Sequence, residues 1–251
     1  MPHENMQLEN QVAVITGGTS GIGLASAAAF TRAGARVVTF ARHDSEAARQ
    51  AVGPRGELIL GDITHTQDLE ELFATTRERF GKVDVLFINA AVIKLAPITE
   101  TSDALLDEIV DTNLKGSFRT LRAAVPYLAD GASVIITTSW INRIGFPGAS
   151  ASSMTKAALR SLVRVAAAEL SPRRIRVNAL CPGAIETPLW GKLGLPDATL
   201  AAAGAQITSQ IPLGRWGKVD ELASAALFLA SGASAYVNGI ELGVDGGMRQ
   251  T

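Results

Sequence analysis

The fold is decided by a glycine-rich turn, Thr16-Gly17-Gly18-Thr19-Ser20-Gly21-Ile22-Gly23. An apolar run typical of a strand, residues 12–15, precedes the turn, and a small-residue stretch typical of a helix, residues 24–29, follows it. This order is the geometry of a dinucleotide site, because glycines let the backbone approach a pyrophosphate and the helix N-terminus offers free N–H groups. The spacing is G-x-x-x-G-x-G rather than the broader G-x-G-x-x-G. A structural turn in another kind of α/β protein is the alternative.

Further apolar, β-branched runs alternate with helical patterns along the chain. Several runs are apolar at successive positions, as is typical of strands buried on both faces. Their alternation with helices predicts a parallel sheet with helices on both sides. The fold class is therefore α/β, with a doubly wound parallel seven-stranded sheet in a single domain over residues 1–251. The predicted strands are residues 12–15, 36–40, 58–60, 83–88, 133–137, 175–180 and 240–244.

The helical segments each carry apolar residues on one face. The last predicted helix covers residues 219–230, and residues 188–217 before it are rich in Ala, Gly and Pro. We interpret 188–217 as a lid over the substrate. The apolar faces comprise Leu69, Leu72, Phe73 and Phe80; Leu105, Leu106, Ile109, Val110, Leu114, Phe118 and Leu121; and Leu159, Leu162, Val163, Ala166 and Leu170.

The composition argues against several classes of function. The chain is 47% hydrophobic and 19% charged with a formal net charge of −1, which is unlike a nucleic-acid-binding or membrane-seeking surface. Residues 1–10 are polar and lack the apolar core of a signal peptide, and no apolar run is long enough to span a bilayer. Cys181 is the only cysteine, which fits a reducing compartment. We expect a cytoplasmic protein without a nucleic-acid or membrane partner, and we predict no metal site.

Several further motifs stand in a fixed order after the turn. They are Asn89-Ala90-Ala91-Val92, the pair Ser139 and Lys156, the run Cys181-Pro182-Gly183-Ala184-Ile185-Glu186-Thr187, and a glycine-ending tail over residues 237–247. Together with the T-G-x-x-x-G-I-G turn, they resemble the short-chain dehydrogenase/reductase family. The resemblance covers nearly the whole chain, from about Leu8 to Met248, and it implies a Rossmann-like oxidoreductase that uses NAD(P).

The resemblance implies a cofactor site at the turn and after the carboxyl ends of the strands. Asp62 would accept a hydrogen bond from the adenine amino group, and Thr187 would bond to the nicotinamide carboxamide. Ala90 and Val92 depart from the family's N-N-A-G, although small residues there leave room for the cofactor. The implied residues are Gly17, Thr19, Ser20, Gly21, Ile22, Gly23, Asp62, Ile63, Asn89, Ala90, Ala91, Lys156, Pro182, Gly183, Ile185 and Thr187.

The end of the second strand favours NADP(H) over NAD(H). Many NAD-binding members of the family carry an Asp where this chain has Ala41, and the next residue here is Arg42. A guanidinium can pair with the 2′-phosphate of NADP bidentately, whereas a carboxylate would repel it. NAD(H) remains possible, because Arg42 can also be a plain surface residue and Asp44 lies close by.

The catalytic pattern is present except at one position. The family places a Tyr thirteen residues after a Ser and four before a Lys; here Ser139 and Lys156 stand in register and Ser152 occupies the Tyr position. Asn113 matches the helix Asn that the family uses to hold a proton-relay water. The implied catalytic residues are Asn113, Ser139, Ser152 and Lys156.

Ser152 changes the chemistry that this pattern can perform. A phenol beside an ammonium gives up a proton near neutral pH, whereas the serine hydroxyl is a far weaker acid and lies nearer the backbone. A water bridging Ser152, Ser139 and Lys156 could carry the proton less efficiently. Three explanations stay open: an inactivated variant of an active reductase, a natural member with altered chemistry, and a cofactor-binding sensor or scaffold without turnover.

The substrate and the assembly are less sharply specified. The side chains of Ser139, Trp140, Phe146 and Trp190 indicate a substrate site for a mostly apolar carbonyl or alcohol of modest size. The family resemblance implies a homo-oligomer, a tetramer, whose helices near 103–128 and 149–170 pair across two-fold axes.

Overall fold

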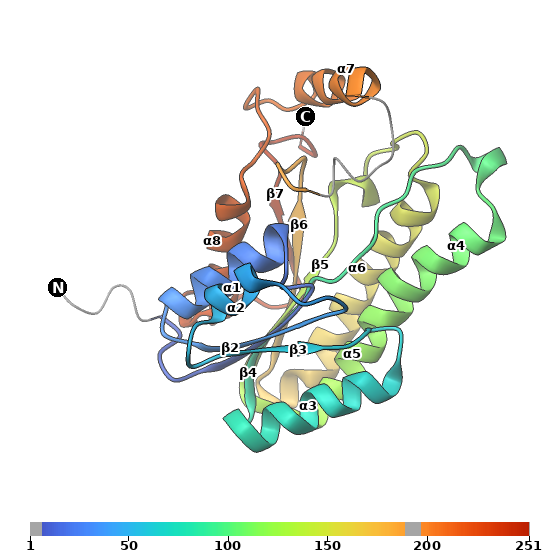
Figure 1. The fold of residues 1–251 in the computed structure, drawn as a ribbon. Helices are drawn as coiled ribbons and strands as arrows, with labels where there is room; N and C mark the ends of the chain where they lie inside the picture. Colours follow the sequence, from blue (N-terminus) through green and yellow to red (C-terminus); the bar gives the residue numbers. More distant parts are fainter. Residues whose placement is uncertain (1–6, 189–196, 251) are drawn as a thin grey trace.

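A parallel sheet organises the molecule. The computed structural model describes residues 7–188 and 197–250, and within them seven parallel strands lie in the order β3-β2-β1-β4-β5-β6-β7 (Figure 1). The predicted doubly wound seven-stranded sheet is therefore confirmed. The strands are β1 (Val12–Thr16), β2 (Arg36–Ala41), β3 (Glu57–Leu60), β4 (Val83–Ile88), β5 (Leu128–Thr137), β6 (Arg176–Pro182) and β7 (Glu241–Val244).

Strand β1 lies at the point where the strand order reverses. All five of its residues are buried, and it pairs in parallel with β2 on one side and β4 on the other. The chain moves outward from β1 in opposite directions before and after this reversal. Such a switch point leaves a crevice beyond the carboxyl ends of the strands, where ligands of this architecture bind.

Two layers of helices cover the sheet (Figure 1). Phe30 of α1 and Leu222 of α8 belong to one apolar core, which also includes Val52 of α2. Leu72 of α3 and Leu159 of α6 belong to the core on the other face. The helices are α1 (Gly21–Arg32), α2 (Glu46–Val52), α3 (Thr66–Phe80), α4 (Asp103–Ile109), α5 (Ser117–Ala124), α6 (Ser150–Leu170), α7 (Asp197–Ser209) and α8 (Val219–Ala230).

The apolar face predicted over residues 105–121 is not one regular helix. A π-helical turn, Val110–Gly116, separates α4 from α5. Apolar spacing does not reveal such a turn, because it carries no information on the backbone hydrogen bonds. Of the predicted face, Ile109 and Leu121 are buried, whereas Phe118 is 46% exposed. Turns of this kind recur at functional sites, and this one contains Asn113.

Two other segments differ from their predicted form. Strand β5 begins at Leu128 rather than at Ser133, and Gly131 within it has a φ of 85°. Helix α7 occupies part of the segment 188–217, which lacked a clear helical pattern because Ala and Gly dominate it. Residues 189–196 of the predicted lid, including the predicted substrate-site residue Trp190, lie outside the described part of the chain.

Candidate active site

A cavity of about 620 Å³ opens at the carboxyl ends of the strands. Its walls include most residues that the sequence singled out. Gly23 and Asn113 do not line it, and Trp190 lies outside the described residues. The predicted residues that line it are Gly17, Thr19, Ser20, Gly21, Ile22, Arg42, Asp62, Ile63, Asn89, Ala90, Ala91, Ser139, Trp140, Phe146, Ser152, Lys156, Pro182, Gly183, Ile185 and Thr187.

The glycine turn forms a backbone cradle that side chains would fill. Gly17 has a φ of +71°, and a Cβ there would lie 2.8 Å from the Cα of Ala90. A Cβ on Gly23 would lie 2.2 Å from the carbonyl oxygen of Gly17, which explains why a residue outside the cavity wall must still be glycine. The first turn of α1 has no acidic residue, and the Ser20 side chain does not cap it. Its N–H groups and positive dipole end are therefore suited to a pyrophosphate.

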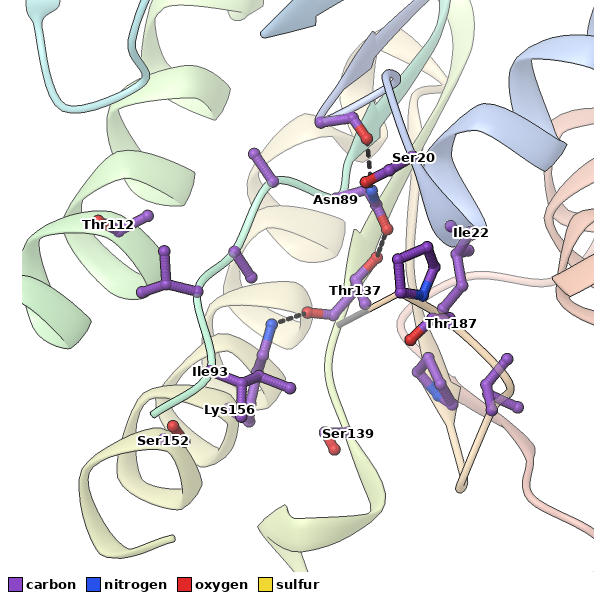
Figure 2. Close-up of a pocket in the computed structure, with 18 of the residues that line it drawn as sticks. Ser20, Ile22, Asn89, Ile93, Thr112, Thr137, Ser139, Ser152, Lys156 and Thr187 are labelled. Atoms are coloured by element: carbon purple, nitrogen blue, oxygen red, sulfur yellow. Dashed lines mark hydrogen bonds between the residues drawn. The ribbon is translucent and has the colours of Figure 1, made fainter. Parts of the chain in front are cut away.

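Asn89 ties this cradle to the neighbouring strands. Its Nδ2 donates to the carbonyl oxygen of Gly17 at 3.3 Å, and its Oδ1 accepts from the hydroxyl of Thr137 at 3.2 Å. Its backbone N–H donates to the Thr16 hydroxyl at 3.0 Å. Figure 2 shows Asn89 between the turn and the end of β5, so one side chain sets the distance between the cradle and the catalytic strand.

The far end of the cavity suits the adenosine half of a dinucleotide. Burial raises the pKa of Asp62, but hydrogen bonds from Thr64 and the charge of Arg42 outweigh burial, and the pKa lies below its usual value. Asp44, whose charge would oppose a phosphate, forms hydrogen bonds of 2.9 and 3.0 Å with the guanidinium of Arg49. Arg42 therefore supplies the positive charge at this end of the cavity, where the Asp62 carboxylate also lies.

Lys156 lies at the other end, where α6 faces β5. Its Nζ donates to the backbone oxygen of Thr137 at 2.9 Å (Figure 2). Burial lowers the pKa of Lys156 from 10.5 to about 8, because a charged ammonium is poorly solvated there; the nearby Cys181 opposes this shift weakly. Burial raises the pKa of the Cys181 thiol to about 12, so this cysteine remains a neutral packed residue.

Ser152 lies one helical turn before Lys156 and therefore on the same face of α6. Its Oγ is buried and has no hydrogen-bond partner among the described residues. Ser139 follows β5 in extended conformation and precedes a short 3₁₀ helix, Trp140–Asn142. Both serines line the cavity with Lys156 (Figure 2), so the buried Ser152 hydroxyl that lacks a partner in the described residues belongs to the same cavity wall as the lysine.

Asn113 does not line the cavity but binds the backbone of the loop after β4, which does. Its Oδ1 accepts from the backbone N–H of Val92 at 2.8 Å, and its Nδ2 donates to the carbonyl oxygen of Val92 at 2.9 Å. The amide side chain thus fixes the loop after β4, which lines the cavity. Sequence reasoning assigned Asn113 to a relay water and did not foresee this pairing, which joins residues from separate elements.

The substrate end is apolar. Trp140 and Phe146 pack edge to face, with ring centroids 5.4 Å apart, and Ile207 of α7 joins the same cluster. Leu95 and Trp216 also line the cavity and were not predicted, because they come from loops without a distinctive pattern. The arrangement orients an apolar body while polar atoms meet it near Ser139 and Ser152.

A backbone cradle, a buried lysine and hydroxyls on one cavity define a nicotinamide-dependent oxidoreductase. The sequence matches the family described as Enoyl-(Acyl carrier protein) reductase over residues 17–249. The chain belongs to the short-chain dehydrogenase/reductase family, which binds NAD(P)(H), and it is an enzyme of that family.

Known relatives cover nearly the whole chain. It is 34% identical over 250 residues to 3-oxoacyl-(acyl-carrier-protein) reductase of Thermotoga maritima, covering 97% of this chain and 99% of that protein. It is 34% identical to L-fucose dehydrogenase of Mus musculus, covering 94% and 88%. The crystal structure of levodione reductase has a TM-score of 0.91 at 30% identity, covering 96% of this chain and 98% of that chain. A short-chain dehydrogenase/reductase from Brucella melitensis also scores 0.91, at 32% identity, covering 98% and 100%.

In the described part of the chain, no helix combines the length and the apolar character that crossing a membrane requires.

Proposed function

We propose that the protein transfers hydride between NADP(H) and a carbonyl/alcohol pair, and that Ser152 at the family's Tyr position slows this reaction. One observation carries the proposal. Ser139, Ser152 and Lys156 line the same cavity as the glycine cradle. A substrate bound beside them would have its oxygen near the hydroxyls and its carbon near the cofactor end.

The cradle and the strand ends would hold the cofactor, with Lys156 near its nicotinamide ribose. When bound, the nicotinamide supplies or accepts the hydride. The residues of the chain manage the substrate oxygen. Ser139 donates a hydrogen bond to this oxygen and orients it. A donor at the position where negative charge develops stabilises the transition state.

The proton must come from a group other than a phenol. Ser152 is a weak acid with a short side chain, whereas Lys156, with a pKa of about 8, holds a transferable proton near neutral pH. We infer that Lys156 supplies it through a water that Ser152 hydrogen-bonds, since the Ser152 hydroxyl is otherwise unpaired. This relay replaces a direct transfer by an indirect one, and turnover is slow.

The preference for NADP(H) rests on the adenosine end. Arg42 lines the cavity, and Asp44 is neutralised by Arg49. A guanidinium that is not held by Asp44 favours a 2′-phosphate. Titrations of the purified protein with NADPH and NADH measure this preference directly, and equal dissociation constants would refute it.

The substrate is proposed to be a ketone, or its alcohol, with an apolar body. Relatives are named for 3-oxoacyl, sugar, polyol and levodione substrates, so family membership leaves the choice open. The wall of Trp140, Phe146 and Ile207 favours an apolar compound over a polyhydroxylated one. Medium-sized ketones are therefore the first substrates to screen.

A tetramer is proposed from the outer helices. Phe118 of α5, together with Met154 and Val165 of α6, exposes a large apolar side chain. Facing copies of these helices would cover such groups across two-fold axes. Sedimentation at micromolar protein tests this, and a monomer alone would contradict it.

The single buried cysteine suits a reducing compartment, for which we propose the cytoplasm.

The deciding experiment restores the phenol. The variant Ser152→Tyr should reduce ketones that the original protein reduces slowly, while NADPH affinity stays nearly constant. If Ser152→Tyr gains no activity across a broad ketone panel, the protein is a cofactor-binding sensor or scaffold instead.

A further inference from the structure

A buried ionic cluster lies directly behind the catalytic turn, at the β7 edge of the sheet. The guanidinium of Arg249 donates to Glu241 at 2.8 Å and to Asp245 at 2.7 Å. The side chains of these three residues are only 2–7% exposed. A fourth charge, on the exposed side chain of Arg143, lies 3.7 Å from Glu241. Charges this deeply buried are costly unless they are paired, and here each one is paired.

The backbone makes room for this cluster. A Cβ on Gly243 would lie 2.0 Å from Nη2 of Arg249, so any larger residue at position 243 would displace the guanidinium. Glu241 and Gly243 point to the same face of the strand, because they are two residues apart. The site for Arg249 is therefore built into β7.

Glu241 of this cluster accepts hydrogen bonds from one residue before Ser139 and from one residue after it. The Thr138 hydroxyl donates to Oε1 of Glu241 at 2.7 Å, and Nδ2 of Asn142 donates to the same oxygen at 2.7 Å. Thr138 precedes Ser139 directly, and Asn142 ends the 3₁₀ helix after it. The Asn142 amide oxygen has no partner among the described residues, so Glu241 is what fixes this side chain. β6 lies between β5 and β7 (Figure 1), and the bond from Thr138 to Glu241 connects the end of β5 to β7 across β6.

We propose that Glu241 is a positioning residue that fixes the Ser139 hydroxyl toward the substrate oxygen, with Arg249 near the C-terminus as its counter-charge. This inference rests on the proposed role of Ser139. Glu241 does not line the cavity; it acts through Thr138 and Asn142. A single carboxylate oxygen that holds both flanks of the turn leaves Ser139 little freedom, and site geometry of this kind must be kept within about 0.5 Å.

A double-mutant cycle in the Ser152→Tyr background tests the coupling. Glu241→Gln cannot serve both Arg249 and the two donors, so we expect kcat for a ketone to fall about tenfold with little change in NADPH dissociation constant. In a Ser139→Ala background, the same substitution should lower kcat less than about twofold, because the group that it positions is absent. Equal losses in both backgrounds would show a general structural role and overturn the proposal.

Thr138→Val and Glu57→Gln complete the design. Thr138→Val removes the hydrogen bond from Thr138 to Glu241 and leaves the ionic cluster intact, so it keeps the test available if Glu241→Gln folds poorly. We expect a smaller loss of kcat than in Glu241→Gln, and this loss should also depend on Ser139. Glu57 lies on β3, at the opposite edge of the sheet, and pairs with Arg79 of α3; Glu57→Gln should leave kcat unchanged. Loss of activity in Glu57→Gln equal to that in Glu241→Gln would overturn the proposal.

A crystal structure of Glu241→Gln without Ser152→Tyr separates this inference from the proposed function. We expect the Ser139 hydroxyl to move by more than about 0.5 Å from its position in the unaltered protein. An unmoved Ser139 overturns the positioning role whatever the activity. Failure of Ser152→Tyr to reduce any ketone overturns the proposed function, while the crystal structure still decides whether Glu241 positions the turn.

Discussion

The two ends of the cavity differ in how fully they keep the family pattern. At the cofactor end, the glycine cradle, Asn89 and the uncapped first turn of α1 are in place, and the departures at Ala90 and Val92 leave room for the cofactor. At the catalytic end, Ser139 and Lys156 are in place, but Ser152 leaves a buried hydroxyl without a partner. If the proposed site roles hold, cofactor binding and proton transfer are separable properties of this scaffold. On the proposed function, we therefore expect an enzyme that holds its cofactor normally and turns over slowly.

Ser152→Tyr should have the largest effect on this comparison, because it makes the two ends match. A general acid contributes about 10²–10⁴-fold to such reactions, so we expect kcat for ketone reduction to rise by about that factor. NADPH oxidation followed by absorbance measures the change. Ser152→Phe is the matched control, since it adds the ring without the hydroxyl. A similar gain in Ser152→Phe would attribute the effect to packing and contradict the proton-transfer argument.

At the cofactor end of the cavity, Gly23→Ala should disrupt the glycine cradle. The new Cβ would meet the carbonyl oxygen of Gly17 at 2.2 Å, so the cradle must shift. Overpacking costs about 1–3 kcal/mol, and because this cost falls on the conformation that binds the pyrophosphate, NADPH affinity should fall about 5- to 150-fold. Isothermal titration calorimetry measures the affinity. Gly232→Ala is a control, because nothing lies within 4 Å of its new Cβ. Unaltered affinity in Gly23→Ala would mean that the cradle does not hold the pyrophosphate.

Arg42→Ala should reduce the discrimination between cofactors without changing the catalytic end. Loss of a charge-assisted contact at an exposed site should weaken NADPH binding about tenfold and leave NADH binding nearly unchanged. Arg55→Ala removes another exposed arginine and should alter neither affinity. If Arg42→Ala weakens NADH equally, the guanidinium supports the adenosine pocket generally and does not select NADP.

The sequence predicts the layers of the fold well and the contacts of the site only partly. The seven strands follow from buried apolar runs, and α8 begins and ends at the predicted residues because its apolar face and charged first turn are clear. The pairing of Asn113 with Val92 and of Lys156 with the carbonyl oxygen of Thr137 could not be predicted, since backbone partners carry no side-chain pattern.

The buried charges were also missed. Glu241 and Arg249 are types of residue that usually lie on the surface, and their burial depends on contacts with Thr138, about a hundred positions earlier. The sequence does not show that the ends of β5 and β7 lie close together, because α6, β6, α7 and α8 separate the two strands along the chain. Their closeness follows from the strand order, in which only β6 lies between them. Pattern reasoning therefore locates the cavity, and long-range polar contacts determine how its residues are held.

The pH dependence of the unaltered protein should show the smallest effect. Burial lowers the pKa of Lys156 to about 8, so the ammonium dominates below this pH and the neutral amine above it. Only the ammonium can donate a proton, and ketone reduction should therefore slow as the pH rises through 8. The protonated fraction falls from about 0.9 at pH 7 to about 0.5 at pH 8, which predicts roughly a twofold loss of kcat. Alcohol oxidation should change in the opposite direction, since the amine accepts the proton. Lys156→Arg stays charged throughout this range and should lack the inflection near pH 8. An identical inflection in Lys156→Arg would assign the titration to another group and remove Lys156 from the relay.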